Sequence, residues 1–144
     1  MKDTGPESMA RQATAALIRN YYEAFNKCDD AGMLACVTDD VIHDVNQGER
    51  RQGKDKFEAF MARMAHHYKE QLEGVTVMVN KDGSRAAAEF NVVGTYLNAE
   101  PGLPEAKGQT YKLPAGAFLA IKDGKIARIT TYYNLTDWIA QVAG

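Results

Sequence analysis

The chain has 144 residues, of which 45% are hydrophobic and 25% charged, and a formal net charge of −2 at pH 7. This length suits one domain that buries about two thirds of the surface its unfolded chain would expose. The scattered charges exclude a basic face for nucleic acid, and no apolar run approaches the roughly 20 residues of a membrane span. Residues 1–7 are polar and unlike a signal peptide. We therefore expect a disordered leader followed by one cytoplasmic domain over residues 8–144.

Apolar residues at helical spacing predict three helices in the first half of the chain. Tyr21 lies at the centre of the apolar stripe of the first helix, and Asp29 or Asp30 can cap the short second helix. The third helix is amphipathic and has about four to five turns. The first and third predicted helices cover residues 8–28 and 57–72, and the short second helix carries Met33, Leu34 and Val37.

Runs of β-branched and aromatic residues predict one short strand between the second and third helices and four further strands after them. Asp123 and Gly124 match a two-residue type I′ turn between the last two strands, and Gly83 is available for a positive φ in the preceding hairpin. Thr136 can cap a final short helix. The predicted strands cover residues 41–45, 75–79, 85–97, 109–121 and 126–135.

This order of elements defines an α+β domain, with three N-terminal helices packed on one mostly antiparallel sheet. Gly94 and the segment 114–116 interrupt two long strands, so we expect bends or bulges there. Such bends would give a strongly curved sheet that encloses a pocket under the helices. An enclosed pocket of this kind is the expected ligand site.

Three motifs are the basis of a family resemblance: "YYEAFNKCDDAGMLACVTDDVIHD" at 21–44, "GKDKFEAFMARM" at 53–64 and "DGKIARITTYYN" at 123–134. They resemble the cone-shaped nuclear-transport-factor-like superfamily, in its SnoaL-like and ketosteroid isomerase-related branch. Together with the strand order they cover nearly the whole chain. The resemblance implies a cone-shaped domain that binds a small molecule and forms a homodimer through its sheet.

The resemblance also implies roles for particular residues. In ketosteroid isomerases a first-strand carboxylate moves a proton beside a carbonyl, while a helix tyrosine and a later acid hydrogen-bond the enolate. Tyr21 matches the tyrosine, and Asp44 matches the carboxylate after a one-residue shift. The later acid has no counterpart, because residues 106–122 contain no Asp or Glu and the matching position is near Ala117. Efficient isomerisation of a 3-oxo steroid by the standard pair is therefore not expected.

His43 and Asp44 are alternatives for the base of a proton transfer. Successive side chains of a strand point to opposite faces, so only one of the two can point into the pocket. His43 would need less adjustment of its pKa to act as a base near neutral pH, because the ordinary pKa of histidine is near 6.5 and that of aspartate near 4. The sequence leaves the choice between them open.

Other polar and aromatic side chains could line the pocket. Glu89 lies in the middle of a strand, where it could face inward as an acid or lie on the wet face, and Asn91 shares its side. Tyr132 and Tyr133 point opposite ways, so only one of them faces the pocket. The candidate lining residues are Glu89, Asn91, Tyr96, Tyr111, Tyr132, Tyr133 and Trp138.

No cofactor or metal is expected for this chemistry. His66 and His67 are adjacent on a helix and lack the i, i+4 spacing that brings two imidazoles to one ion. The sequence also lacks a Gly-rich phosphate loop, a serine nucleophile elbow and a dinucleotide-binding motif.

The leading functional hypothesis is binding of a small, largely apolar carbonyl compound with proton transfer, as in an isomerase or an aldol-type cyclase. Asp44 or His43 would be the base and Tyr21 the hydrogen-bond donor. The alternative is a non-catalytic ligand-binding or dimerisation module, which the missing acid near Ala117 favours. A third hypothesis is epoxide hydrolysis, with Glu89 as the second acid that such a reaction requires.

Overall fold

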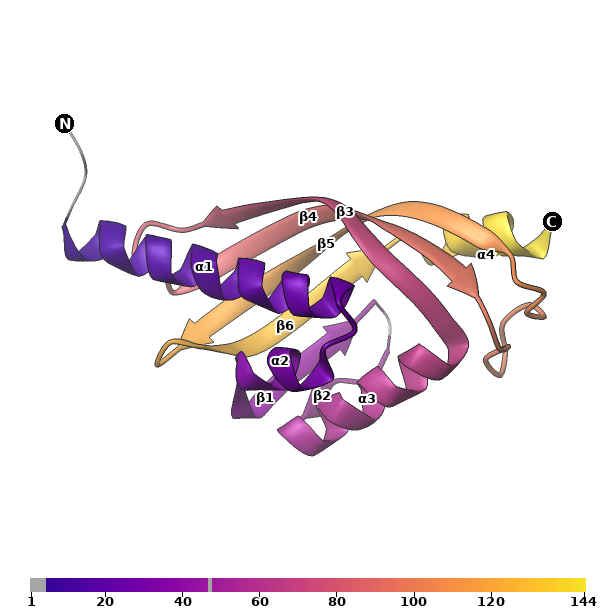
Figure 1. The fold of residues 1–144 in the computed structure, drawn as a ribbon, viewed down its shortest axis with the longest axis horizontal. Helices are drawn as coiled ribbons and strands as arrows, with labels where there is room; N and C mark the ends of the chain where they lie inside the picture. Colours follow the sequence, from indigo (N-terminus) through magenta and orange to yellow (C-terminus); the bar gives the residue numbers. More distant parts are fainter. Residues whose placement is uncertain (1–4, 47) are drawn as a thin grey trace.

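Six strands form one mixed sheet in the order β2-β1-β6-β5-β4-β3 in the computed structural model, which describes residues 5–46 and 48–144 (Figure 1). Neighbouring strands are antiparallel except β1 and β6, which are parallel. The helices are α1 (Pro6–Asn26), α2 (Asp30–Ala35), α3 (Lys54–His67) and α4 (Leu135–Ala143). The strands are β1 (Val37–Val45), β2 (Arg51–Gln52), β3 (Tyr68–Val79), β4 (Arg85–Tyr96), β5 (Thr110–Lys122) and β6 (Lys125–Tyr133).

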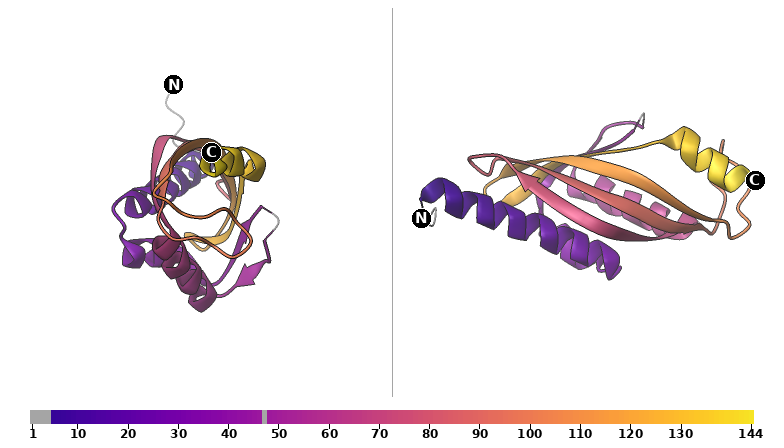
Figure 2. Two further views of the ribbon diagram at one scale, coloured as in Figure 1. Left: turned by 90° about the vertical axis from the view of Figure 1, so that its right-hand side faces the viewer. Right: turned by 90° about the horizontal axis from the view of Figure 1, so that it is seen from above.

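The sheet has an inner face, which packs against α1 and α3, and an outer face on the other side. Helix α1 contacts β3, α3 contacts β1 and β3, and α4 contacts β5. Figures 1 and 2 show α4 at the opposite end of the long molecule from the start of α1. The inner face therefore has one half under α1 and α3 and another half next to α4.

The main core fills the half of the inner face under α1 and α3. Its centre is fully buried, with Ile18 and Phe57 of the helices 0% and 1% exposed, and Leu119 and Ile129 of the sheet 1% exposed each. Removing such side chains from water is the principal stabilisation of a domain of this size. A second, smaller core lies next to α4 and is mostly aromatic.

The α+β class, the helices before the sheet and the antiparallel β3–β6 series are confirmed. Helix α1 begins at Pro6, so the predicted disordered leader is wrong for Pro6 and Glu7, while residues 1–4 lie outside the described part of the chain. Strand β1 begins at Val37, earlier than predicted, and the two-residue strand β2 was not predicted. None of the described helices is both long and apolar enough to cross a membrane.

The third helix was predicted too long. It ends at His67, and Tyr68 to Leu72 belong to β3, where they pair with β4 from Tyr96 to Val92. An apolar spacing of four residues, such as that between Tyr68 and Leu72, fits one face of a helix and also one face of a strand. The ladder of hydrogen bonds with β4 decides between these two structures.

The predicted turn between β5 and β6 is confirmed, because Asp123 and Gly124 both have the positive φ of a type I′ turn, 51° and 74°. Gly83 also has a positive φ, 77°. The last helix is capped by Asn134, whose Oδ1 accepts from the backbone N–H of Asp137 at 3.0 Å, so the prediction of Thr136 as the cap is wrong.

The sheet is long and twisted, without the strong curl that the sequence predicted (Figure 1). The register of β4 against β5 runs without interruption through Gly94 and through residues 114–116, so the bulges predicted there are absent. The irregularity of the β3–β4 pair lies at Gly74, between Glu73 and Thr76, where the glycine has a φ of 65°. Of the three glycines at positions 74, 94 and 116 of these strands, only Gly74 lies at a bulge.

Candidate functional site

His43 lies on the inner face of β1 and is 5% exposed. Its ring packs against the rings of Phe57 and Phe60, with centroids 5.1 and 4.6 Å away. Its Nδ1 atom is buried and has no hydrogen-bond partner among the described residues. Burial is the main cause that lowers the pKa of His43 from 6.5 to about 4, with a smaller contribution from the positive charge of Arg51. The imidazole is therefore neutral near pH 7 and can accept a proton.

Asp44 lies on the outer face, as strand alternation requires when His43 faces inward. Its carboxylate accepts two hydrogen bonds from Arg50, at 2.8 and 2.9 Å, and one from the Thr130 hydroxyl at 2.9 Å. The hydrogen bond from Arg50 is the main cause that lowers the pKa of Asp44 below its ordinary value. Asp44 is therefore an ionised partner of a surface arginine, and the structure does not bring it together with Tyr21.

Tyr21 belongs to the same inner-face core as His43. Its side chain is 5% exposed, and its ring contacts Tyr22 edge to face at 5.0 Å. The ring centroid of Phe57 lies 6.5 Å away, so Phe57 contacts both Tyr21 and His43. Burial raises the pKa of Tyr21 well above 10, which keeps its hydroxyl protonated and able to donate.

Five aromatic side chains gather on the half of the inner face next to α4, and we call them the aromatic cluster. The rings of Tyr68 and Tyr96 are stacked, with centroids 5.5 Å apart and an angle of 13° between their planes. The Trp138 indole contacts both stacked rings edge to face, at 5.0 and 5.9 Å, and also the Tyr111 ring at 5.9 Å. The predicted lining residues Tyr96, Tyr111, Tyr133 and Trp138 all belong to this cluster, which Tyr68 completes.

Glu70 is the polar residue of this region that the sequence analysis missed. It points inward from β3 beside the aromatic cluster, and the Tyr111 hydroxyl donates to its Oε2 at 2.5 Å. Burial raises the pKa of Glu70, and the hydrogen bond from Tyr111 opposes this rise. Because the predicted helix continued through residue 70, no strand face was assigned to this acid. The alternation of "YKEQL" at 68–72, with Tyr68, Glu70 and Leu72 on one side, could have revealed it.

A second acid, Glu100, reaches the aromatic cluster from the loop between β4 and β5. It accepts a hydrogen bond from the Tyr68 hydroxyl at 2.6 Å and one from Arg63 Nε at 3.0 Å. Its side chain is 13% exposed, whereas that of Arg63 is 54% exposed. The loop is thereby attached to β3 and α3 at the edge of the inner face.

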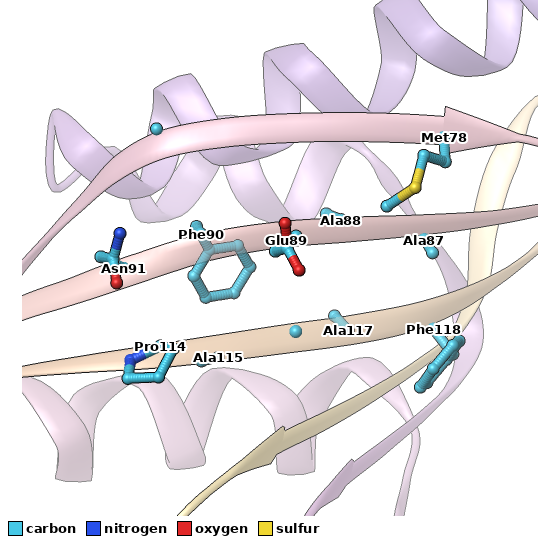
Figure 3. Close-up of a pocket in the computed structure, with 12 residues that line it drawn as sticks. Met78, Ala87, Ala88, Glu89, Phe90, Asn91, Pro114, Ala115, Ala117 and Phe118 are labelled. Atoms are coloured by element: carbon cyan, nitrogen blue, oxygen red, sulfur yellow. The ribbon is translucent and has the colours of Figure 1, made fainter.

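Three predicted lining residues, Glu89, Asn91 and Tyr132, lie on the outer face instead. Glu89 and Asn91 line an open hollow of about 550 Å³ between β4 and β5, with Phe118 at one end (Figure 3). Glu89 is exposed, as its wet-face alternative predicted, and it shares its side with Asn91. Tyr132 is 52% exposed, while Tyr133 turns inward. This hollow is open to solvent, unlike the enclosed pocket that the sequence predicted.

The sequence matches a known domain family over most of its length. The SnoaL-like domain matches residues 18–129, and the chain belongs to this family. Among curated proteins, none matches the sequence. A structure of an "NTF2-like protein of unknown function" from Burkholderia pseudomallei, 18% identical, superposes with a TM-score of 0.78 over 92% of this chain and 98% of that one. The nuclear-transport-factor-like fold expected from the sequence is therefore confirmed.

Three solved structures are more similar in sequence, and each is described as a "putative polyketide cyclase". The protein from Pseudomonas putida KT2440 is 59% identical, with a TM-score of 0.86 over 88% of this chain and 95% of that one. The protein from Silicibacter sp. TM1040 is 53% identical, with a TM-score of 0.90 over 92% and 97%. The protein from Xanthomonas campestris pv. campestris is 49% identical, with a TM-score of 0.89 over 92% and 98%.

Proposed function

We propose that this protein binds a small, largely apolar carbonyl compound on its inner face and catalyses cofactor-independent proton transfer there. The reaction is an isomerisation or an aldol-type ring closure, with His43 as the base. The observation that carries the proposal is the buried neutral imidazole of His43, whose Nδ1 has no partner among the described residues. A polar atom left unpaired in a core is costly, so it calls for a functional explanation. The description of each of the three similar proteins as a "putative polyketide cyclase" supports this reaction class.

In the proposed reaction, neutral His43 takes a proton from the carbon next to the carbonyl group. The electron pair of that C–H bond moves into an enolate, whose oxygen accepts a hydrogen bond from the Tyr21 hydroxyl. The enolate then either regains the proton at another carbon or attacks a second carbonyl carbon of the same molecule, in which case the alkoxide that forms takes the proton back from His43. A base with a pKa near 4 is strong enough, since the aspartate base of ketosteroid isomerase has a pKa of about 4.6.

A proton-exchange experiment tests this proposal, with 2-tetralone as an apolar bicyclic ketone probe in D₂O. NMR follows the loss of the protons next to the carbonyl group. We expect exchange above the buffer rate with the wild type, and a loss of about 100-fold or more of the protein-dependent rate in His43→Gln, because general bases contribute factors of this size. Asp44→Asn is the matched control on the next residue and should retain the rate within about threefold, since Asp44 faces away from the core.

Two results would contradict the proposal: unchanged exchange in His43→Gln, or a loss of exchange in Asp44→Asn that equals the loss in His43→Gln. Wild-type protein that binds 2-tetralone without accelerating exchange would instead support the non-catalytic alternative. The epoxide hydrolase alternative has no support from Glu89, because this acid lies on the outer face, away from His43 and Tyr21.

We also propose that the outer face of the sheet is a homodimer interface. Phe118, Tyr132 and Met78 of β5, β6 and β3 are 55%, 52% and 50% exposed on this face. Phe118 and Tyr132 contact each other edge to face at 6.1 Å. Large apolar side chains that are exposed together typically mark an interaction surface, and a twofold contact between identical faces is the commonest form of association.

A further inference from the structure

Glu70, Gly94 and Tyr111 lie side by side across three neighbouring strands. Glu70 of β3 pairs with Gly94 of β4, and Gly94 pairs with Tyr111 of β5. The Tyr111 side chain lies across the glycine to reach the carboxyl group of Glu70. A Cβ atom at position 94 would lie 2.4 Å from Tyr111 Cζ and 2.5 Å from its hydroxyl oxygen, far inside van der Waals contact. The absence of a side chain at Gly94 is therefore what permits the Glu70–Tyr111 hydrogen bond.

The surroundings of this pair combine apolar rings with negative charge. Trp138 contacts the Tyr111 ring, and Tyr133 turns toward the same region from β6. The pKa of Tyr133 is raised, first by burial and then by the negative charges of Glu70 and Glu100. Arg63, which reaches the edge of this region, is already paired with Glu100.

We propose that Glu70 and Tyr111 form a polar subsite of the inner face that binds a neutral hydroxyl group of the ligand and disfavours a carboxylate. The inference rests on the proposed function only in placing the ligand on the inner face, and it does not depend on the role of His43.

The ionised carboxylate of Glu70 gives this preference, because it accepts a hydrogen bond from a ligand hydroxyl group and repels an anion. The Tyr111 hydroxyl, whose pKa is also raised by burial and by Glu70, donates its one proton to Glu70, and its oxygen can accept a hydrogen bond from the ligand hydroxyl group. A ligand carboxylate would lose its hydration here, beside the negative charge of Glu70, while the guanidinium of Arg63 is already paired with Glu100.

The test compares two probes that share one ring system, 2-naphthol and 2-naphthoic acid, by titration calorimetry at pH 7. At this pH the first carries a neutral hydroxyl group and the second a carboxylate at the same ring position. We expect the wild type to bind 2-naphthol at least about tenfold more tightly, because like charges placed together in a desolvated site cost affinity. In Glu70→Gln, which keeps the size and removes the charge, the preference should fall to within about threefold, mainly through tighter binding of the carboxylate.

Matched variants separate this inference from other effects. Glu73→Gln removes an exposed acid from the outer face of the same strand, where Glu73 pairs with Lys112 at 3.5 Å, and should keep the wild-type preference. Tyr111→Phe should weaken binding of 2-naphthol and serves as the second variant if Glu70→Gln fails to fold. His43→Gln should keep the preference while it loses proton exchange, so the two proposals fail independently.

The inference is overturned if the wild type does not bind 2-naphthol at millimolar concentration or binds both probes equally. It is also overturned if Glu73→Gln reduces the preference as much as Glu70→Gln does.

Discussion

At the scale of single residues, burial distinguishes two adjacent polar side chains. His43 and Asp44 are neighbours in the chain, but one contacts two phenyl rings and the other binds a surface arginine. The first is neutral near pH 7 and the second is ionised. The sequence established that they face opposite ways, and the packing against Phe57 and Phe60 places His43 on the inner face, where we propose that it acts as the base.

The burial of His43 predicts a pH dependence of stability. The unfolded chain binds a proton on this residue near pH 6.5, whereas the folded chain does so near pH 4, so the unfolded state holds more protons between these values. The stability that comes from keeping His43 neutral is fully present above pH 6.5, and it is lost as the pH falls toward 4. Between pH 7 and pH 5, the free energy of unfolding of the wild type should fall by up to about 2 kcal/mol more than that of His43→Gln.

Urea unfolding at the two pH values measures this difference. His66→Gln is the matched control, because His66 is an exposed histidine of α3 and should leave the wild-type pH dependence unchanged. An equal fall in stability for wild type and His43→Gln would contradict the assignment of His43 as a buried neutral imidazole.

At the scale of elements, the N-terminal cap of α4 differs between the prediction from the sequence and the structure. Both Thr136 and Asn134 are residue types that cap helices, and the cap was predicted at Thr136. The structure uses Asn134, because β6 ends at Tyr133 and the helix begins at once at Leu135. A cap is effective only on the residue that immediately precedes the first helical turn.

We therefore predict that Asn134→Ala lowers the free energy of unfolding by about 1 kcal/mol, the usual cost of losing a helix cap. Thr136→Ala, two residues away and also exposed, should change it by less than about 0.5 kcal/mol. Urea unfolding of both variants at pH 7 measures the difference. A larger effect of Thr136→Ala than of Asn134→Ala would show that the cap has been placed wrongly.

At the scale of the whole molecule, the two faces of the sheet have different proposed tasks. The inner face holds His43, Tyr21 and the aromatic cluster, and the outer face exposes Phe118 and Tyr132. Dimerisation through the outer face would leave both inner faces free for ligand. Substitutions on the outer face should therefore affect dimerisation, and substitutions on the inner face should affect ligand binding.

The dimer interface is tested by light scattering coupled to size exclusion. We expect the wild type to have twice the 15.9 kDa mass of the chain, and Phe118→Glu to shift the population to monomer by placing a charge in the apolar contact. Met9→Glu is the control, because Met9 is an equally apolar residue of α1 that is 66% exposed away from the sheet. A monomeric wild type, or a Phe118→Glu variant that stays dimeric, would contradict the proposed interface.

The sequence by itself determined the class of fold, the order of elements apart from β2, and the tight turn at Asp123–Gly124, because these depend on local spacing and on backbone preferences of single residues. It also determined that His43 and Asp44 face opposite ways and that Tyr132 and Tyr133 do so too, since alternation is a local property of a strand. The family follows from motifs spread over the chain.

Only the tertiary structure decided which face of each strand lies inside and where α3 ends and β3 begins. It also explains why position 94 requires a glycine. These depend on pairing between segments far apart in the chain: Glu70, Gly94 and Tyr111 become neighbours only when β3, β4 and β5 are in register. For the same reason Glu70 could not be recognised as a site residue from its own segment, whose apolar spacing fits both a helix and a strand.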